Sequence, residues 1–315
     1  MKNHITSKFI TGTYHGYNVK FSPFRQNQLA CASSENYGIA GLGRLYVIDT
    51  DTNEGCKIIT MREWSDGLFD VTWSECDPHL LVTSCGDGSI QLWDCMTTFE
   101  PKQFYKIHEK EVYSVDWNPK NAYSYILSAS WDTTIKLWNP YVAREVAAFR
   151  EHTDQIYEAK WCPHYPEIFA SVSGDASLKL WDIRYPNRCT GVYMHDMEVL
   201  SCDWCKSDPK VLASATTDGK IFGWDMRKAR YPLFILSGHE YAVRRLKFSP
   251  FEPGVLASVS YDFTTRFWNW MEPSPLQVHK EHKEFVYGLD YNPLIPGQAC
   301  DCAWDSEIHI YNTVQ

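Results

Sequence analysis

A tryptophan that recurs at a nearly constant interval is the feature that most constrains how this chain can fold. It closes a run of alternating apolar residues at Trp93, Trp138, Trp181, Trp224 and Trp268, and Tyr311 takes the same place in the last run. The intervals are 45, 43, 43, 44 and 43 residues. One period before Trp93, Ile48 lies in a similar run, Arg44 to Asp49, so the chain contains seven units.

A second aromatic series repeats with the same period, at Phe21, Trp73, Trp117, Trp161, Trp204, Phe248 and Tyr291. Between the two series a unit carries a strand of small residues and a tight turn with an aspartate, as in Leu127 to Asp132; in the first unit Leu42 stands in place of that aspartate. Four short strands per unit at this period are typical of a propeller blade. We therefore expect an all-β fold, a seven-bladed β-propeller in which residues 1–315 form one domain. The predicted blades are residues 14–50, 67–95, 111–140, 155–183, 198–226, 242–270 and 285–312.

The dipeptide Trp-Asp closes three of these runs, at Trp93-Asp94, Trp181-Asp182 and Trp224-Asp225, and Asn replaces Asp at Trp138-Asn139 and Trp268-Asn269. With the histidines that open the units, this pattern resembles the WD-repeat family over nearly the whole chain. The resemblance implies a protein that binds other proteins and is not an enzyme.

The two ends of the chain are expected to meet in one sheet. The sequence ends four residues after Tyr311, so the last blade has no outer strand of its own. An open propeller would leave unpaired strand edges on its end blades. We expect residues 8–13 to supply the missing strand.

The charge of the chain argues against one class of partner, and its cysteines indicate its compartment. The net charge of −9 and a pI near 5.7, with no basic cluster, argue against nucleic acid. No apolar run has the length of a secretory signal or a membrane span. Eleven cysteines without a framework spacing are typical of reduced thiols, so we expect a cytoplasmic protein.

The histidines that open the units recur with a serine and an aspartate, as in His108, Ser128 and Asp132. Such a set is reminiscent of a nucleophilic triad, but an enzyme needs only one. A repeated set indicates a hydrogen-bond network inside each blade. The predicted network residues are His108, Asp132, His152, Asp175, His195, Asp218, His239 and Asp262.

Metal binding is not expected. Cys202 and Cys205 have the spacing of half a zinc site, but no second pair with that spacing exists. The sequence also lacks a phosphate-binding glycine loop and a metalloprotease helix. We predict no metal, no cofactor and no catalytic residue.

WD-repeat proteins commonly bind partners on one face of the ring, at the start of each innermost strand and just before the turn aspartate. In this chain those positions and their neighbours are rich in aromatic and acidic side chains, a composition that favours an amphipathic helix with cationic side chains as ligand. The alternative is that several of these rings plug the central channel. The candidate binding residues are Asp66, Phe69, Glu111, Tyr113, Trp131, Asp154, Tyr157, Glu198, Leu200, Arg244, Tyr261, Tyr287 and Trp304.

Several stretches outside the generic repeat resemble the WD-repeat receptors for the type 2 peroxisomal targeting signal. They are His15 to Tyr17, Phe21 to Phe24, Asp66 to Trp73, Glu198 to Lys206, Tyr241 to Phe251, Ser260 to Thr264 and Glu284 to Asp290. The resemblance implies recognition of a peptide of the form Arg-Leu, five residues, His-Leu near the N-terminus of folded matrix proteins. It also implies a co-receptor, docking proteins at the peroxisomal membrane, and shuttling between cytoplasm and peroxisome.

On this hypothesis the leucines of the signal are held by apolar side chains and its basic groups by carboxylates. The predicted apolar contacts are Phe69, Tyr113, Tyr157, Leu200 and Tyr287, and the predicted acidic partners are Asp66, Glu111 and Glu198.

Two other functions remain open. Trp181 to Arg184 and Trp224 to Arg227 fit a short motif of substrate receptors in cullin-type ubiquitin ligases, and a generic interaction scaffold would share the same fold. A propeller hydrolase would require a metal or a unique acid pair at the channel mouth.

Overall fold

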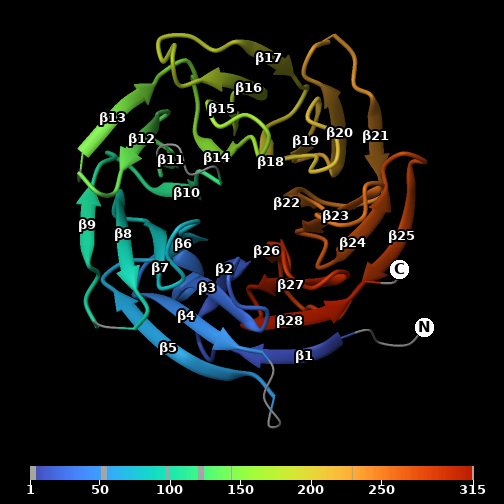
Figure 1. Cartoon of the computed structure of the whole chain (residues 1–315). Helices are drawn as coiled ribbons and strands as arrows, with labels where there is room; N and C mark the ends of the chain where they lie inside the picture. The colour runs from blue at the N-terminus through green and yellow to red at the C-terminus, as the bar shows by residue number, and fades with distance from the viewer. Residues whose placement is uncertain are drawn as a thin grey trace.

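The computed structural model describes residues 5–50, 55–96, 99–119, 124–142, 144–228 and 230–313. Seven four-stranded antiparallel sheets are arranged around a central channel (Figure 1). The chain is therefore a seven-bladed β-propeller, as the repeat predicted.

Each blade has its strands in chain order from the channel outwards, except the last. The innermost strands are β2 (His15–Phe21), β6 (Leu68–Trp73), β10 (Val112–Trp117), β14 (Ile156–Trp161), β18 (Val199–Trp204), β22 (Val243–Phe248) and β26 (Val286–Tyr291). The second strands are β3 (Gln28–Ser34), β7 (Leu80–Cys85), β11 (Ile126–Ser130), β15 (Ile168–Ser173), β19 (Val211–Thr216), β23 (Val255–Ser260) and β27 (Gln298–Ala303).

The third strands carry the recurring tryptophan: β4 (Gly43–Asp49), β8 (Ser89–Asp94), β12 (Ile135–Asn139), β16 (Ser177–Asp182), β20 (Lys220–Asp225), β24 (Thr265–Asn269) and β28 (Glu307–Asn312). The outer strands are β5 (Lys57–Trp64), β9 (Gln103–Lys106), β13 (Arg144–Phe149), β17 (Gly191–Met194), β21 (Phe234–Ser237), β25 (Ser274–His279) and, in the seventh blade, β1 (Ile5–Ile10). One short 3-10 helix, η1 (Asn36–Gly38), lies between β3 and β4.

The ring closes through the N-terminal segment, as expected. Strand β1 pairs antiparallel with β28, from Ile5 opposite Tyr311 to Ile10 opposite Glu307, and the two strands lie side by side in Figure 1. The strand covers Ile5–Ile10, so the predicted range 8–13 is wrong by three residues. Residues 11–13 instead turn the chain inwards to β2, because Gly12 adopts a left-handed φ of 79° that ends the strand.

Apolar cores lie between consecutive blades. One of them joins Ala32, Leu45 and Val47 of the first blade to Val71 and Trp93 of the second. Because neighbouring blades cover both faces of each sheet, innermost strands such as β6 and β18 are buried throughout their length. The innermost strands line the channel. No helix among the described residues is long and apolar enough to cross a membrane.

Every innermost strand contains a β-bulge at the same place. The pairing of β10 with β11 passes from Val112 directly to Ser114, leaving Tyr113 without a partner. A bulge re-aims the extra side chain, so two successive residues can point into the channel. The seven bulged residues are Tyr17, Phe69, Tyr113, Tyr157, Leu200, Arg244 and Tyr287.

Candidate functional site

The histidine network locks three blades internally. In the third blade His108 Nδ1 lies 2.8 Å from Asp132 and Nε2 lies 2.8 Å from the Ser128 hydroxyl, which accepts the Trp138 indole N–H at 3.1 Å. The same bonds recur around His152 and His239. Because Ser128 is fully buried, it has no access to a substrate, and this favours a structural role over a catalytic one.

Burial and hydrogen bonding set the charges of this network. Burial lowers the pKa of His108 and keeps its imidazole neutral. Burial alone would raise the pKa of Asp132, but hydrogen bonds from His108 and Thr134 hold it well below its usual range. The carboxylate is therefore ionised and acts as an acceptor.

The fifth blade departs from the predicted network. His195 bonds Ser214 at 2.8 Å, but Asp218 bonds the Thr216 hydroxyl at 2.6 Å and the Lys220 ammonium at 2.5 Å instead of His195. Lys220 stands where the third blade has Thr134, and its charge holds the carboxylate away from the imidazole. The expected pairing of His195 with Asp218 was wrong for this reason.

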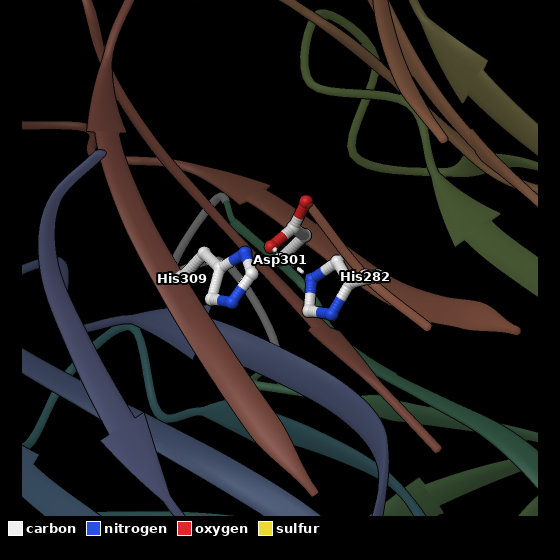
Figure 2. Close-up of side chains that lie close together, drawn as sticks. All are labelled: His282, Asp301 and His309. Carbon is white, nitrogen blue, oxygen red and sulfur yellow. Dashed lines mark hydrogen bonds and ion pairs between the residues drawn. The ribbon is translucent and has the colours of Figure 1, made fainter. Parts of the chain in front are cut away.

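The seventh blade brings His282, Asp301 and His309 together in a buried group (Figure 2). His282 bonds Asp301 at 3.0 Å and Asp305 at 2.9 Å; burial opposes its charge, but the two carboxylates raise its pKa to about 10. The His282 and His309 rings are stacked, 3.9 Å apart at 9°. A metal must lie in the plane of each imidazole that ligates it, so this arrangement fits a hydrogen-bonded stack and not a metal site.

Side chains of the innermost strands fill the channel in three layers. The bulged residues form the first layer, at the end that we call the aromatic mouth. Below it, Arg245 reaches across the channel to Glu158 at 3.1 Å and Asp70 at 3.6 Å. The third layer surrounds a cavity of about 280 Å³ at the opposite end, the charged mouth, with Lys20, Asp116, Lys160, Asp203, Lys247 and Asp290.

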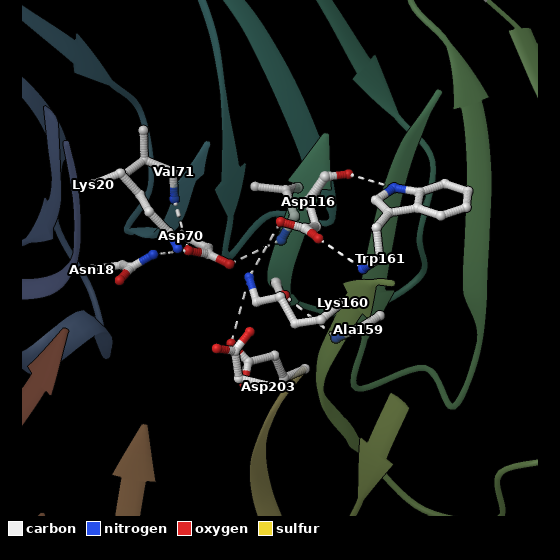
Figure 3. Close-up of polar contacts among 12 residues, drawn as sticks. Asn18, Lys20, Asp70, Val71, Asp116, Ala159, Lys160, Trp161 and Asp203 are labelled. Carbon is white, nitrogen blue, oxygen red and sulfur yellow. Dashed lines mark hydrogen bonds and ion pairs between the residues drawn. The ribbon is translucent and has the colours of Figure 1, made fainter. Parts of the chain in front are cut away.

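The carboxylates of these layers join adjacent blades (Figure 3). Asp116 accepts the backbone N–H of Trp161 at 2.8 Å, and Asp70 accepts that of Val115 at 3.0 Å. Each bond satisfies a backbone donor on the open edge of an innermost strand, where no further strand is available to pair. These channel charges were not found from the sequence; the bonds of Asp70 and Asp116 join the innermost strands of neighbouring blades.

The predicted aromatic residues form one cluster at the aromatic mouth, together with Tyr17 and Phe285. Tyr17, Phe69, Tyr113 and Tyr287 are buried, while Trp131, Tyr157, Tyr261, Phe285 and Trp304 are partly exposed above them. The rings contact one another: the Tyr113 and Trp131 centroids are 4.9 Å apart, and those of Tyr287 and Trp304 are 4.7 Å apart. The cluster thus contains both buried rings, which pack against one another, and partly exposed rings, which are accessible from outside.

Arg244 and Leu200 also lie in this layer. The Arg244 guanidinium is 5.1 Å from the centre of the Tyr113 ring and 4.9 Å from that of Tyr287, a cation–π arrangement. Arg244 is 1% exposed and Leu200 is 5% exposed. Arg244 therefore holds the cluster together and is not displayed to a ligand in this structure.

Carboxylates border the cluster on the second to fifth blades. Asp66 and Glu111 are half-buried, whereas Asp154 and Glu198 are exposed. Burial raises the pKa of Asp66, and the nearby negative charges of Asp87 and Glu111 raise it further. Glu198 accepts the Tyr157 hydroxyl at 3.0 Å, so the acidic border contacts the aromatic cluster directly. A cationic ligand would relieve this repulsion.

Sequence reasoning missed one element of this site, the connection of residues 35–42 between β3 and β4. It contacts Tyr17 and Trp304 through Tyr37. Its length was the available signal, since β3 ends at Ser34 and β4 begins at Gly43, whereas β11 and β12 are separated by only four residues.

Comparison with known proteins agrees with this architecture. The domain family described as "WD domain, G-beta repeat" matches residues 55–94, 99–139, 143–182, 187–225 and 230–269. The chain belongs to the WD-repeat family of β-propellers.

Similar proteins show to which group of WD-repeat proteins the chain belongs. A mouse protein named peroxisomal targeting signal 2 receptor is 60% identical over 301 residues, which cover 95% of this chain and 94% of the relative. A Dictyostelium discoideum protein of the same name is 50% identical over 291 residues, or 90% and 91% of the two chains. Peroxisome biogenesis protein 7 of Arabidopsis thaliana is 44% identical over 302 residues, 95% of each chain.

Within the WD-repeat family, the chain thus belongs to the peroxisomal targeting signal 2 receptors. This membership and the propeller fold point to a role other than catalysis. The relatives give no support to a substrate receptor of a cullin-type ligase.

Proposed function

We propose that the aromatic mouth binds the helical targeting signal Arg-Leu-x5-His-Leu of proteins destined for the peroxisome matrix. The observation that carries the proposal is the border of Asp66, Glu111, Asp154 and Glu198 beside a cluster of partly exposed rings. Signal residues seven apart lie on the same face of a helix, so the two leucines form one apolar stripe and the Arg and His form a cationic stripe beside it.

In the bound state the leucines contact the partly exposed rings of Trp131, Tyr157, Tyr261 and Trp304. The buried Phe69, Tyr113 and Tyr287 belong to the same cluster and support those rings, whereas Leu200, also predicted to be a contact, is buried. Asp66, Glu111 and Glu198 pair with the Arg and the His. Charge-assisted hydrogen bonds to these groups provide both orientation and selectivity.

The wider cycle is part of the same proposal. A co-receptor joins the complex of chain and cargo, docking proteins at the peroxisomal membrane receive it, and the chain shuttles between cytoplasm and peroxisome. The chain supplies recognition and performs no chemical step. It needs no metal or cofactor for this role.

The test is the binding of a fluorescent Arg-Leu-x5-His-Leu peptide to the purified chain, with and without a co-receptor fragment. A peptide with Asp in place of the Arg is the ligand control. We expect Glu111→Lys to weaken binding at least about tenfold, because it replaces an attractive charge by a repulsive one. Glu272→Lys, an exposed site in the β24–β25 loop, is the matched control. No selective binding in either condition would contradict the proposal.

A further inference from the structure

The connection of residues 35–42 in the first blade is a compact structure with its own hydrogen bonds. The backbone N–H of Glu35 donates to Leu42 at 3.0 Å, and that of Leu42 donates to the Glu35 carboxylate at 2.9 Å. The N–H of Gly38 donates to the Glu35 carbonyl at 2.8 Å. Asn36 and Tyr37 both adopt a left-handed φ, 44° and 57°, which these bonds must hold in place. The connection therefore has a defined shape.

This connection is fixed against the aromatic mouth. The Tyr17 hydroxyl donates to the Tyr37 carbonyl at 2.7 Å, and the Tyr37 ring stacks on His15 with centroids 3.9 Å apart at 15°. The backbone of Gly38 lies directly on the rings below, since a Cβ there would be 2.5 Å from the Tyr17 hydroxyl oxygen and 2.8 Å from a Phe69 ring carbon. Residues 35–42 thus contact the cluster through Tyr37 and Gly38.

The residue after Gly38 is Ile39, whose side chain is 87% exposed, the highest value among the large hydrophobic side chains of the described residues. Leu42, at the end of the same connection, is 39% exposed. An isoleucine held in solvent by a hydrogen-bonded backbone does not stabilise the fold of the free chain, and exposed apolar side chains beside a binding surface are typical of contact sites.

The acidic border near this connection indicates which kind of ligand would contact Ile39. Gly43, next to Leu42, packs against the backbone carbonyl of Asp66, the first carboxylate of the acidic border. The connection and the glycine that follows it therefore contact both the aromatic cluster, at Gly38, and the first residue of the acidic border, at Gly43. A helix with adjacent apolar and cationic stripes complements Ile39 and Asp66 together.

Resting on the proposed function, we propose that residues 35–42 form a wall of the cargo site and that Ile39 packs against a leucine of the targeting helix. Ile39 is then a specificity-determining residue: it adds apolar contact to that made by the partly exposed rings, of which Trp304 contacts Tyr37 of the wall.

The test uses the full chain and the fluorescent signal peptide, with and without the co-receptor fragment. We expect Ile39→Asp to weaken binding of the peptide about tenfold in both conditions, or about 1.4 kcal/mol. Leu276→Asp, which places the same charge at a 55% exposed site on outer strand β25, should leave binding unchanged. Equal melting temperatures of the variants would show that the fold is retained.

A double-mutant cycle then addresses the contact itself. Ile39→Ala should weaken the wild-type peptide about threefold but should have less effect on peptides in which the contacted leucine is Ala, because contacting residues are not additive. Additivity for both leucines would overturn the proposal, as would wild-type affinity of Ile39→Asp. Weakening only when the co-receptor fragment is present would assign Ile39 to the co-receptor and overturn the cargo contact. If the wild-type chain binds no signal peptide, the proposed function is contradicted, and so is the proposal that residues 35–42 form a wall of the cargo site.

Discussion

Replacing Glu158 by Gln should destabilise the propeller from the centre of its channel. Glu158 is 1% exposed and accepts hydrogen bonds from the Ser201 hydroxyl at 2.6 Å and the Cys202 N–H at 3.0 Å. Its other oxygen bonds Arg245 at 3.1 Å and lies 3.5 Å from the Lys160 ammonium. The glutamine amide preserves the size of the side chain and one acceptor, so the main change is the loss of negative charge.

The magnitude follows from the buried pair. At the 3.1 Å separation of Glu158 and Arg245, an effective dielectric constant of about 20 corresponds to an attraction of about 5 kcal/mol. Desolvation of both groups offsets much of this attraction in the intact protein, but removal of one partner leaves the other charge buried and costs about 3–5 kcal/mol. We expect Glu158→Gln to lower the free energy of unfolding by about 3 kcal/mol and the Tm by roughly 6 °C.

A double-mutant cycle with Arg245→Met isolates the pair. Urea denaturation of the wild type, both single variants and the double variant should give a coupling free energy of at least about 1.5 kcal/mol, with the double variant more stable than the sum of the single effects predicts. Additive losses within about 0.5 kcal/mol would refute the inference that the ion pair across the channel stabilises the ring.

Three further perturbations address closure, protonation and packing. Deletion of residues 1–10 removes β1 and exposes the edge of β28, so thermal denaturation should show a sharply lowered Tm; an unchanged Tm would contradict closure by this strand. Burial lowers the pKa of His195 to about 4, so the unfolded chain binds more protons at this residue between pH 6.5 and 4, and stability is lost as the pH falls. From pH 7.5 to 5.5 the wild type should lose about 1.4 kcal/mol more than His195→Gln in urea titrations, and equal losses would be evidence against a neutral imidazole. Gly288→Ala should lower the free energy of unfolding by about 1–3 kcal/mol, because a Cβ there would lie 2.5 Å from the Cys302 sulfur and 2.7 Å from the Asn18 Cα. Gly191→Ala is the control, since a Cβ there would have no contact closer than 3.5 Å. Equal Tm values for the two variants would contradict the packing argument.

The fold could be predicted from the sequence because each blade is a local unit. A strand, a turn and an aromatic residue recur every 43 to 45 residues, and each recurrence indicates the same four strands. The need to cover an open edge then predicted closure by the N-terminal segment. The bounds of β1 were missed because Gly12 ends the strand through its own backbone conformation, which the alternation of side chains does not reveal.

The hydrogen-bond network was predictable to the extent that it is repeated. His108, His152 and His239 have the same partners because their blades carry the same residues at the same places. His195 differs because a single lysine, Lys220, competes for the aspartate of its blade. A pattern shared by all units cannot predict that one aspartate bonds a lysine instead of the histidine of its blade.

The sequence by itself determined the number of blades, their strand order, the family, and the residue types gathered near one face of the ring. Only the tertiary structure decided which of these residues are exposed. A bulge in every innermost strand turns Tyr113 and its six equivalents towards the channel, and ring closure then packs them against one another, so that Arg244 and Phe69 are buried while Trp131 and Tyr157 reach the surface. Contacts such as Arg245 with Glu158 join residues 87 positions apart, and they depend on the diameter of the closed ring. No local pattern encodes that distance, because it arises from all seven blades packing together.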